Sequence, residues 1–203
     1  MNFEKQLSDE RARRVKSLSN TRSLYLGSSE TLRDVGGQAI IVLCYAHWEG
    51  YFNFCVERYI EYVNSLGRRI VDVNPALLAC EIEPHIVSLK DRNFRIELRP
   101  NFARKVFSLM ACQTISQNVP LLKAASNLDF DRLRACLDAL EISEARFLPH
   151  RNFIVHELVK WRHQVAHGDE PALGSADFLA HSHRTEELLL ITKESFEDKL
   201  RTF

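Results

Sequence analysis

Residues 31–66 read TLRDVGGQAIIVLCYAHWEGYFNFCVERYIEYVNSL, and this stretch decides the fold class of the chain. It contains no proline, and its apolar residues recur every three or four positions, as expected for one buried face of a helix. These residues include Ile40, Leu43, Cys44, Trp48, Phe52, Cys55, Tyr59 and Tyr62. The stretch predicts one long helix at the centre of the core, or two helices joined near Gly36 and Gly37, with Gly67 as the stop.

The segments on either side also read as helices. Residues 3–19 are highly charged, with sparse apolar positions at helical spacing, so we expect a solvated helix there and a loop over residues 19–30. Further helices are expected over residues 75–89 with a break or restart at Pro84, 100–115, 127–142, 150–167 and 183–200. The prediction is one all-α domain spanning residues 1–203, in which residues 1–28 form an N-terminal helical extension.

The composition favours helices and limits the ways in which the chain could bind nucleic acid. Hydrophobic residues make up 45% of the chain, and with only 7 glycines and 6 prolines it lacks the tight turns of sandwiches and barrels. The 27 basic residues balance the 27 acidic ones, whereas proteins that bind long duplexes through bulk electrostatics are usually basic. Any contact with nucleic acid therefore has to come from a local patch.

The cysteines and the N-terminus indicate a cellular compartment. The 5 cysteines are scattered and contain no CxxC pair, which argues against structural zinc and a disulfide framework and favours a reducing compartment. The N-terminus is charged, unlike a signal peptide, and the longest apolar run (residues 39–46) is far shorter than the roughly 20 residues of a membrane span. We expect a soluble, cytoplasmic protein without membrane contact.

Residues 150–168 form the clearest amphipathic segment. On a helix with about 100° per residue, one stripe faces the core and consists of Ile154, Leu158, Trp161 and Val165. A second, narrower stripe beside it consists of Val155, Val159, Arg162 and Ala166. A third face carries His156, His163 and His167, with Lys160 near it. Gly168 can end the helix in the left-handed conformation.

Arg162 and His167 are the candidate functional pair in this segment. A guanidinium is costly to bury in an apolar stripe unless it has a partner, and His167 falls in the last turn, where a side chain can project from the helix end. The two residues lie about 140° apart on an ideal helix. Both could reach one site if the helix end unwinds, if Arg162 reaches around, or if two copies pack along the second stripe.

Two segments together resemble a known family. Residues 162–168, RHQVAHG, resemble the R-x4-H signature of HEPN ribonucleases, with a polar residue after the arginine and an Ala-His-Gly ending. Residues 45–51, YAHWEGY, resemble the A-H-W-E-G-Y segment of the RiboL-PSP-HEPN-like prokaryotic proteins, which are often found in toxin–antitoxin and phage-defence loci. R-x4-H alone occurs by chance in many helices, so the resemblance rests on both segments and covers roughly residues 30–200.

This resemblance implies a fold and a chemistry. It implies an up-and-down helical bundle that dimerises through the R-x4-H helices, and cleavage of RNA by its own 2′-OH without a metal or cofactor. His167 would act as general base or acid, and Arg162 would stabilise charge on the phosphoryl oxygens. His163 and Lys160 would bind the substrate, and His47 and Glu49 would support the site.

Several alternatives remain open at the level of sequence. Asp169 stands where some HEPN toxins have the tyrosine of R-x4-H-x-Y, so neutralisation by a partner nucleotidyltransferase is not supported. His163 and His167 have zinc-ligand spacing, but Gln164 replaces the glutamate that a HExxH site needs. Glu49 could pair with Arg162 or face solvent.

Three functions compete. The first is an endoribonuclease that acts as a toxin or antiviral defence effector, with RNA as substrate and an antitoxin protein as a possible partner. The second is a non-catalytic HEPN-type module that binds a nucleotide, RNA or a protein. The third is a purely structural helical dimer. The intact arginine and histidine favour the first.

Overall fold

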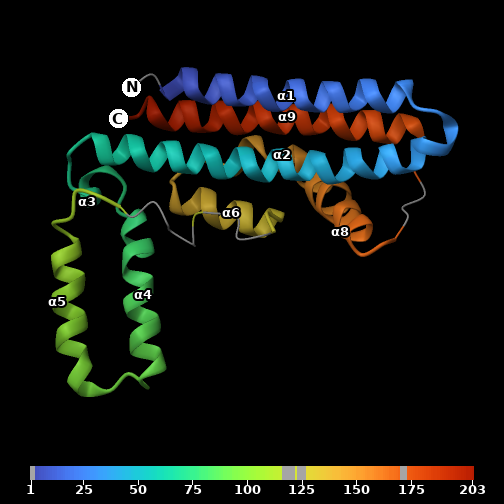
Figure 1. Cartoon of the computed structure of the whole chain (residues 1–203). Helices are drawn as coiled ribbons and strands as arrows, with labels where there is room; N and C mark the ends of the chain where they lie inside the picture. Colours follow the sequence, from blue (N-terminus) through green and yellow to red (C-terminus); the bar gives the residue numbers. More distant parts are fainter. Residues whose placement is uncertain (1–2, 116–121, 123–126, 170–172) are drawn as a thin grey trace.

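The chain folds into helices alone wherever its structure is described. The computed structural model describes residues 3–115, 122, 127–169 and 173–203, and within these ranges it contains no strand. Three long helices, α1, α9 and α2, run side by side, and the shorter helices lie on the side of α2 away from α1 (Figure 1). The predicted all-α class and its bundle of long helices are therefore confirmed.

Helix α2 (Glu30–Ser65) is the central element of the core. It is one continuous helix through Gly36 and Gly37, which settles the choice between one helix and two. Gly37 is required by packing, because a Cβ there would lie 2.4 Å from the ring of Phe178 in α9. The chain leaves the helix through Gly67, whose φ of 61° is left-handed and therefore favours glycine.

Helices α1 (Phe3–Gly27) and α9 (Ser175–Leu200) complete the three-helix core. The loop predicted over residues 19–30 is wrong, because α1 continues to Gly27 and buries Tyr25 against the ring of Phe178. Its buried residues Phe3, Leu7, Leu18 and Tyr25 form only a narrow stripe, which explains why the sequence pattern was weak. The remaining contact surface of α1 is partly polar: Arg22 bonds to Ser182 and pairs with Glu186 of α9. The extension is thus an integral helix of the bundle.

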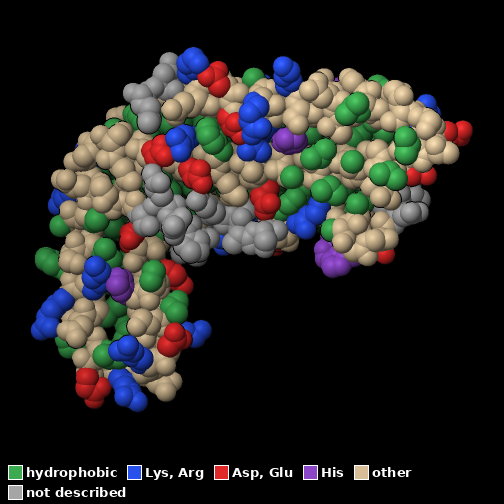
Figure 2. Space-filling model, in the orientation of Figure 1, with side chains coloured by type: hydrophobic (Ala, Val, Ile, Leu, Met, Phe, Trp, Pro, Cys, Tyr) green, Lys and Arg blue, Asp and Glu red, His purple; other side chains and the backbone are tan. Residues whose placement is uncertain are grey.

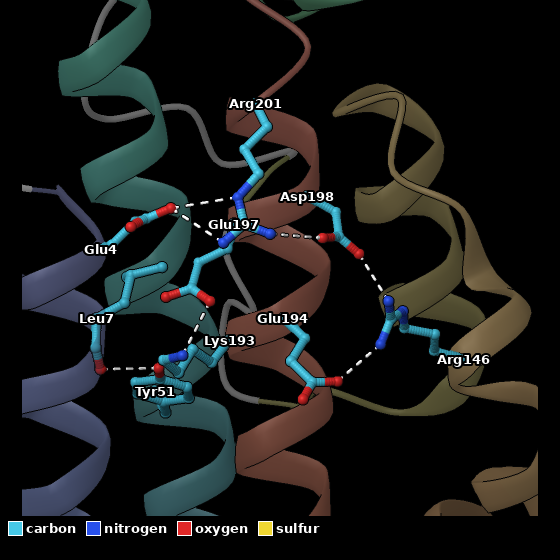
Figure 3. A network of polar contacts seen from close by, with 9 residues as sticks. All are labelled: Glu4, Leu7, Tyr51, Arg146, Lys193, Glu194, Glu197, Asp198 and Arg201. Atoms are coloured by element: carbon cyan, nitrogen blue, oxygen red, sulfur yellow. Dashed lines mark hydrogen bonds and ion pairs between the residues drawn. The ribbon is translucent and has the colours of Figure 1, made fainter.

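A polar network joins the helices at the C-terminal end of α9 (Figure 3). Arg201 pairs with Glu4 of α1, at 3.1 Å, and with Asp198 one turn before it in α9. Asp198 in turn pairs with Arg146, which also pairs with Glu194 of α9, both at 2.7 Å. Most of these side chains are half exposed, so each pair contributes only about 0–1 kcal/mol.

The short helices lie against α2 and lead toward the amphipathic segment. Helix α3 (Ile70–Val73) follows α2, and α6 (Phe130–Ala139) begins at Asp129, whose carboxylate accepts a hydrogen bond from the backbone N–H of Arg132. Two short 3-10 turns, η2 (Glu144–Arg146) and η3 (Leu148–His150), then connect α6 to the helix that starts at Arg151. α6 is therefore shorter than the predicted helix over residues 127–142.

Helices α4 (Leu77–Asp91) and α5 (Arg99–Leu109) form a hairpin that projects from one end of α2, away from the bundle (Figure 1). A 3-10 turn, η1 (Ile96–Leu98), lies between them. The break predicted at Pro84 is wrong, because α4 runs through this proline at the expense of one backbone hydrogen bond. None of the described helices is both long enough and apolar enough to cross a membrane.

Candidate functional site

The amphipathic segment is helical, but it is not one regular α-helix. After α7 (Arg151–Phe153) the chain forms a π-helical segment, η4 (Ile154–Val159), and then returns to α-helix in α8 (Lys160–Ala166). A π turn holds one extra residue, so it rotates the following residues by about 100° relative to an uninterrupted α-helix. The rotational position of Arg162 and His167 is therefore set by this segment.

The π turn changes the stripes predicted from a regular helix. Ile154 and Leu158 are fully buried as expected, and Trp161 and Val165 are partly buried against the same core. Val155 and Val159 also pack against the core, whereas Ala166 is exposed. The single continuous stripe of Val155, Val159, Arg162 and Ala166 is thus wrong, because Val155 and Val159 lie in the π-helical segment and Arg162 and Ala166 in the α-helix that follows it.

The end of α8 places His167 outside the helix. Gly168 has a φ of 86°, and its N–H donates to the carbonyl of Val165 at 3.1 Å. The N–H of Asp169 donates to the carbonyl of Gln164 at 2.9 Å, which completes a Schellman motif. His167 is the last residue before the left-handed turn, so its exposed side chain projects from the helix end as predicted.

Arg162 is held in a fixed position by two side chains. The centre of its guanidinium lies 4.1 Å from the centroid of the Tyr45 ring, which is the geometry of a cation–π contact. One terminal nitrogen donates to Oδ1 of Asn127 at 2.7 Å. The Nε atom is buried without a described partner. Arg162 is only partly buried, and Asn127 is the one hydrogen-bond acceptor that the described residues provide for its guanidinium.

Tyr45 connects Arg162 to two further residues, Leu128 and Glu49. Its hydroxyl accepts a hydrogen bond from the backbone N–H of Leu128 at 2.6 Å and donates to Oε1 of Glu49 at 2.9 Å. Burial raises the pKa of Tyr45 to about 12, and the neighbouring carboxylate of Glu49 adds to the rise. The tyrosine therefore stays neutral, and Glu49 is joined to Arg162 through Tyr45 rather than by a direct bond.

His163 and His167 lie together on the surface of α8. Their ring centroids are 4.3 Å apart, and both side chains are exposed. His156 and Lys160 are exposed as well. Figure 2 shows histidine side chains gathered at the free end of the α8 region. No described hydrogen bond or ring contact joins Arg162 to His167, so the candidate pair shares a helix without direct contact.

His47 lies against α1 instead of near Arg162. Its Nε2 is 3.1 Å from Oγ of Ser17, and its carbonyl accepts a hydrogen bond from Arg14 at 3.0 Å. Burial, together with the positive charge of Arg14, lowers the pKa of this imidazole. The structure therefore places Glu49 beside Tyr45, in the cluster formed by Arg162, Tyr45, Asn127 and Glu49. It directs His47 toward α1.

His181 of α9 supports α8 from the core side. Its imidazole is 1% exposed and stacks on Trp161 of α8, with ring centroids 5.0 Å apart. The ring of Phe153 packs edge-on against it at 5.2 Å. Burial, and to a lesser degree Arg184, lowers the pKa of His181 to about 4, so the ring is neutral at pH 7. Arg184 also pairs with Glu157 at 2.6 Å, which ties η4 to α9.

Within the described ranges, no group of three or more His, Cys, Asp and Glu side chains is arranged to hold a metal ion.

Comparison with known protein families identifies the chain. A family model described as HEPN_MAE_28990-like HEPN matches residues 3–202. The chain belongs to the HEPN domain family. Neither the curated proteins nor the solved structures contain a match. The HEPN resemblance seen in the sequence is thus confirmed at the level of the family, although the matching model is not described by the RiboL-PSP name.

Sequence reasoning missed two members of the cluster around Arg162 in this HEPN chain. Tyr45 was given no role at the site, yet its ring face contacts Arg162 and its hydroxyl bonds to Glu49 and Leu128. Asn127 was placed only as the start of a helix, and it bonds to Arg162 across 35 residues of sequence. No local pattern marks Asn127; the position of Tyr45 directly before the A-H-W-E-G-Y segment could have pointed to it.

Proposed function

We propose that this HEPN protein is a metal-independent endoribonuclease centred on Arg162 and His167. The observation that carries the proposal is the contrast between the two residues. Tyr45 and Asn127 hold Arg162, and the described residues offer no acceptor to the rest of its guanidinium, while His167 projects from the helix end into solvent. A fixed cation beside a free imidazole suits proton transfer next to a phosphodiester.

In the proposed reaction, the 2′-OH of one nucleotide attacks the adjacent phosphorus. The 2′ oxygen loses its proton, the bond from phosphorus to the 5′ oxygen breaks, and that oxygen takes up a proton. The products carry a 2′,3′-cyclic phosphate and a 5′-OH. His167 acts as general base or acid in these transfers, because an imidazole titrates near neutral pH.

Arg162 stabilises the negative charge that develops on the phosphoryl oxygens. A guanidinium presents planar, paired donors that match two oxygens at once, which a lysine cannot do. Contact with Tyr45 and Asn127 fixes the side chain before substrate arrives, so little conformational entropy is lost in the reaction. His163, with its ring against that of His167, and Lys160 contact the RNA backbone.

We further propose that two copies assemble through their R-x4-H helices and share one cleft. Arg162 and His167 of one copy make no direct contact, so a second copy supplies a way to bring both groups to one phosphodiester. Because Val155 and Val159 pack in the core, the exposed C-terminal half of α8 is the face that meets the partner copy.

Three variants test the chemistry. His167→Ala should lower the cleavage rate by roughly 10²- to 10⁴-fold, the usual size of general acid–base assistance. Arg162→Lys should also be damaging, and His163→Ala should cost less. Cleavage should persist in EDTA, and an RNA with hydrogen in place of the scissile 2′-OH should remain uncut. Circular dichroism checks that the variants are folded.

Equal losses at His163 and His167, with zinc bound by elemental analysis, would replace this proposal with a metal site. Cleavage by the His167→Ala variant at the wild-type rate would refute the role of His167, and a wild type that cuts no RNA would leave a non-catalytic binding module. A toxin or phage-defence role is tested by expression: the wild type should arrest growth, and His167→Ala should not.

A further inference from the structure

The projecting hairpin differs from the bundle in its charge. Its tip, which we define as residues 90–105, contains two acidic residues, Asp91 and Glu97, and six basic residues. The basic residues are Lys90, Arg92, Arg95, Arg99, Arg104 and Lys105. The tip therefore carries a net charge of +4 in a chain whose formal net charge is zero. This is the local basic patch that nucleic-acid binding by a neutral chain requires.

The basic side chains of the tip have no acidic partner among the described residues. All six are exposed, and none forms an ion pair within the part of the chain that the structure describes. Arg99 donates only to the carbonyl of Phe94 at 3.1 Å, and Arg104 only to Oδ1 of Asn101 at 3.0 Å. On the bundle, by contrast, Arg22 pairs with Glu186.

Large apolar side chains lie exposed among these charges. Phe107 is 77% exposed, Ile96 69% and Phe94 50%. Figure 2 shows Lys and Arg side chains interspersed with hydrophobic ones over the hairpin. Phe94 has a φ of 51°, in the left-handed region that bulky residues avoid. The loop thus holds an aromatic ring in solvent in a strained backbone conformation, which is typical of a binding feature.

A hollow lies between the two helices of the hairpin. It has a volume of about 230 Å³ and is lined by side chains that include His85, Arg92, Phe102 and Lys105. This is smaller than the roughly 300–1,000 Å³ of pockets for drug-sized ligands. It places cationic donors beside an aromatic ring.

We propose that the α4–α5 hairpin is an arm that binds single-stranded RNA and delivers it to the R-x4-H site. Unpaired basic side chains contact the phosphates, and the exposed phenylalanines stack on bases, as in proteins that bind single strands without sequence preference. The hairpin and α8 project to the same side of α2 (Figure 1), so one strand can reach both. The delivery step rests on the proposed ribonuclease function, but binding by the arm does not.

Binding of a fluorescein-labelled, 2′-O-methylated single-stranded RNA tests the arm without cleavage. The hairpin variant Arg92→Gln/Lys105→Gln should lower the slope of log affinity against log salt by about 1.4, or about 0.7 per lost phosphate contact. The matched control Arg13→Gln/Lys16→Gln removes the same charge from α1 and should keep the wild-type slope. Phe107→Ala should weaken binding by about 5- to 160-fold through lost stacking.

The outcomes separate the two proposals. A wild type that binds RNA through the hairpin but cuts none would refute the ribonuclease and leave the arm intact. Hairpin variants that bind RNA as the wild type does would overturn the proposal of an RNA-binding arm, whether or not the protein cleaves RNA. The exposed apolar side chains of the hairpin would then contact a protein partner. Equal affinity for duplex and single-stranded RNA would also overturn it, since stacking needs free bases.

Discussion

The bundle and the α4–α5 hairpin use the same kinds of side chain in opposite ways. In the bundle, Phe52 is fully buried against Phe196, and Arg22 forms an ion pair. On the hairpin, Phe107 and the basic residues of the tip are exposed to solvent, and none of these basic residues has a described ion-pair partner. In the bundle, these aromatic and charged side chains thus stabilise the fold.

This difference separates stability from recognition within one chain. Residues that fold the molecule are those with partners inside it, and residues that lack such partners are available to something outside. Arg162 belongs to both groups, because Tyr45 and Asn127 hold it while part of its guanidinium has no partner among the described residues.

The largest expected effect on stability comes from replacing one phenylalanine with alanine in each of the two regions. Phe52→Ala should lower the free energy of unfolding by about 3–5 kcal/mol, because it removes a buried ring and leaves a cavity. Phe107→Ala should change it by no more than about 0.5 kcal/mol, since that ring is already in water. Urea denaturation of the two variants measures both values. A comparable loss in each would mean that the hairpin is part of the stabilising core.

A smaller effect is expected from pH, through His181 in the bundle. Its pKa is lowered from 6.5 to about 4 by burial, so below pH 6.5 the unfolded chain binds a proton that the folded chain does not. Stability should therefore fall as pH drops from about 6.5 to about 4, by roughly 3 kcal/mol from this group.

His181→Phe keeps the ring packing and should remove that part of the pH dependence, measured by urea unfolding at pH 7 and at lower pH. The variant His85→Gln takes a histidine from the hairpin and serves as the control. An unchanged pH dependence in His181→Phe would show that the imidazole is protonated in the folded protein.

The smallest effect compares the two left-handed glycines. Gly168→Ala and Gly67→Ala each force an alanine into a left-handed conformation in open space, so each should cost about 1–2 kcal/mol of stability. Only Gly168→Ala should also slow RNA cleavage at saturating substrate, because it disturbs the helix end that presents His167. Equal rates in the two variants would contradict the role given to the Schellman motif.

The sequence predicted the fold class and the central helix well because both depend on strong periodic patterns. The 36 residues of α2 have an apolar residue at nearly every third or fourth position, and Gly67 stops the helix as expected. The pattern of α1 was weaker, since its buried stripe is narrow and Arg14 and Arg22 supply part of its packing surface. Its C-terminal third was therefore taken for a loop.

The candidate site was only partly predictable. Arg162, His163 and His167 lie close in sequence, so one helical segment was enough to find them. The contact of Asn127 with Arg162 depends on how distant segments meet, and no local rule reports that. The π turn was missed because an assumed 100° per residue cannot reveal an extra residue in a turn. That assumption also produced the incorrect stripe of Val155, Val159, Arg162 and Ala166.

The π turn has a consequence for insertions and deletions in this helix. A chain one residue shorter between Phe153 and Lys160 could form a regular α-helix and keep every residue of the R-x4-H segment. In that helix, Arg162 would point away from Tyr45. The end of α8, which carries His167, would also face a different direction. The number of residues between Phe153 and the R-x4-H motif therefore matters as much as the motif itself. A relative with an intact R-x4-H motif but a different number of residues before it would orient the arginine and histidine differently.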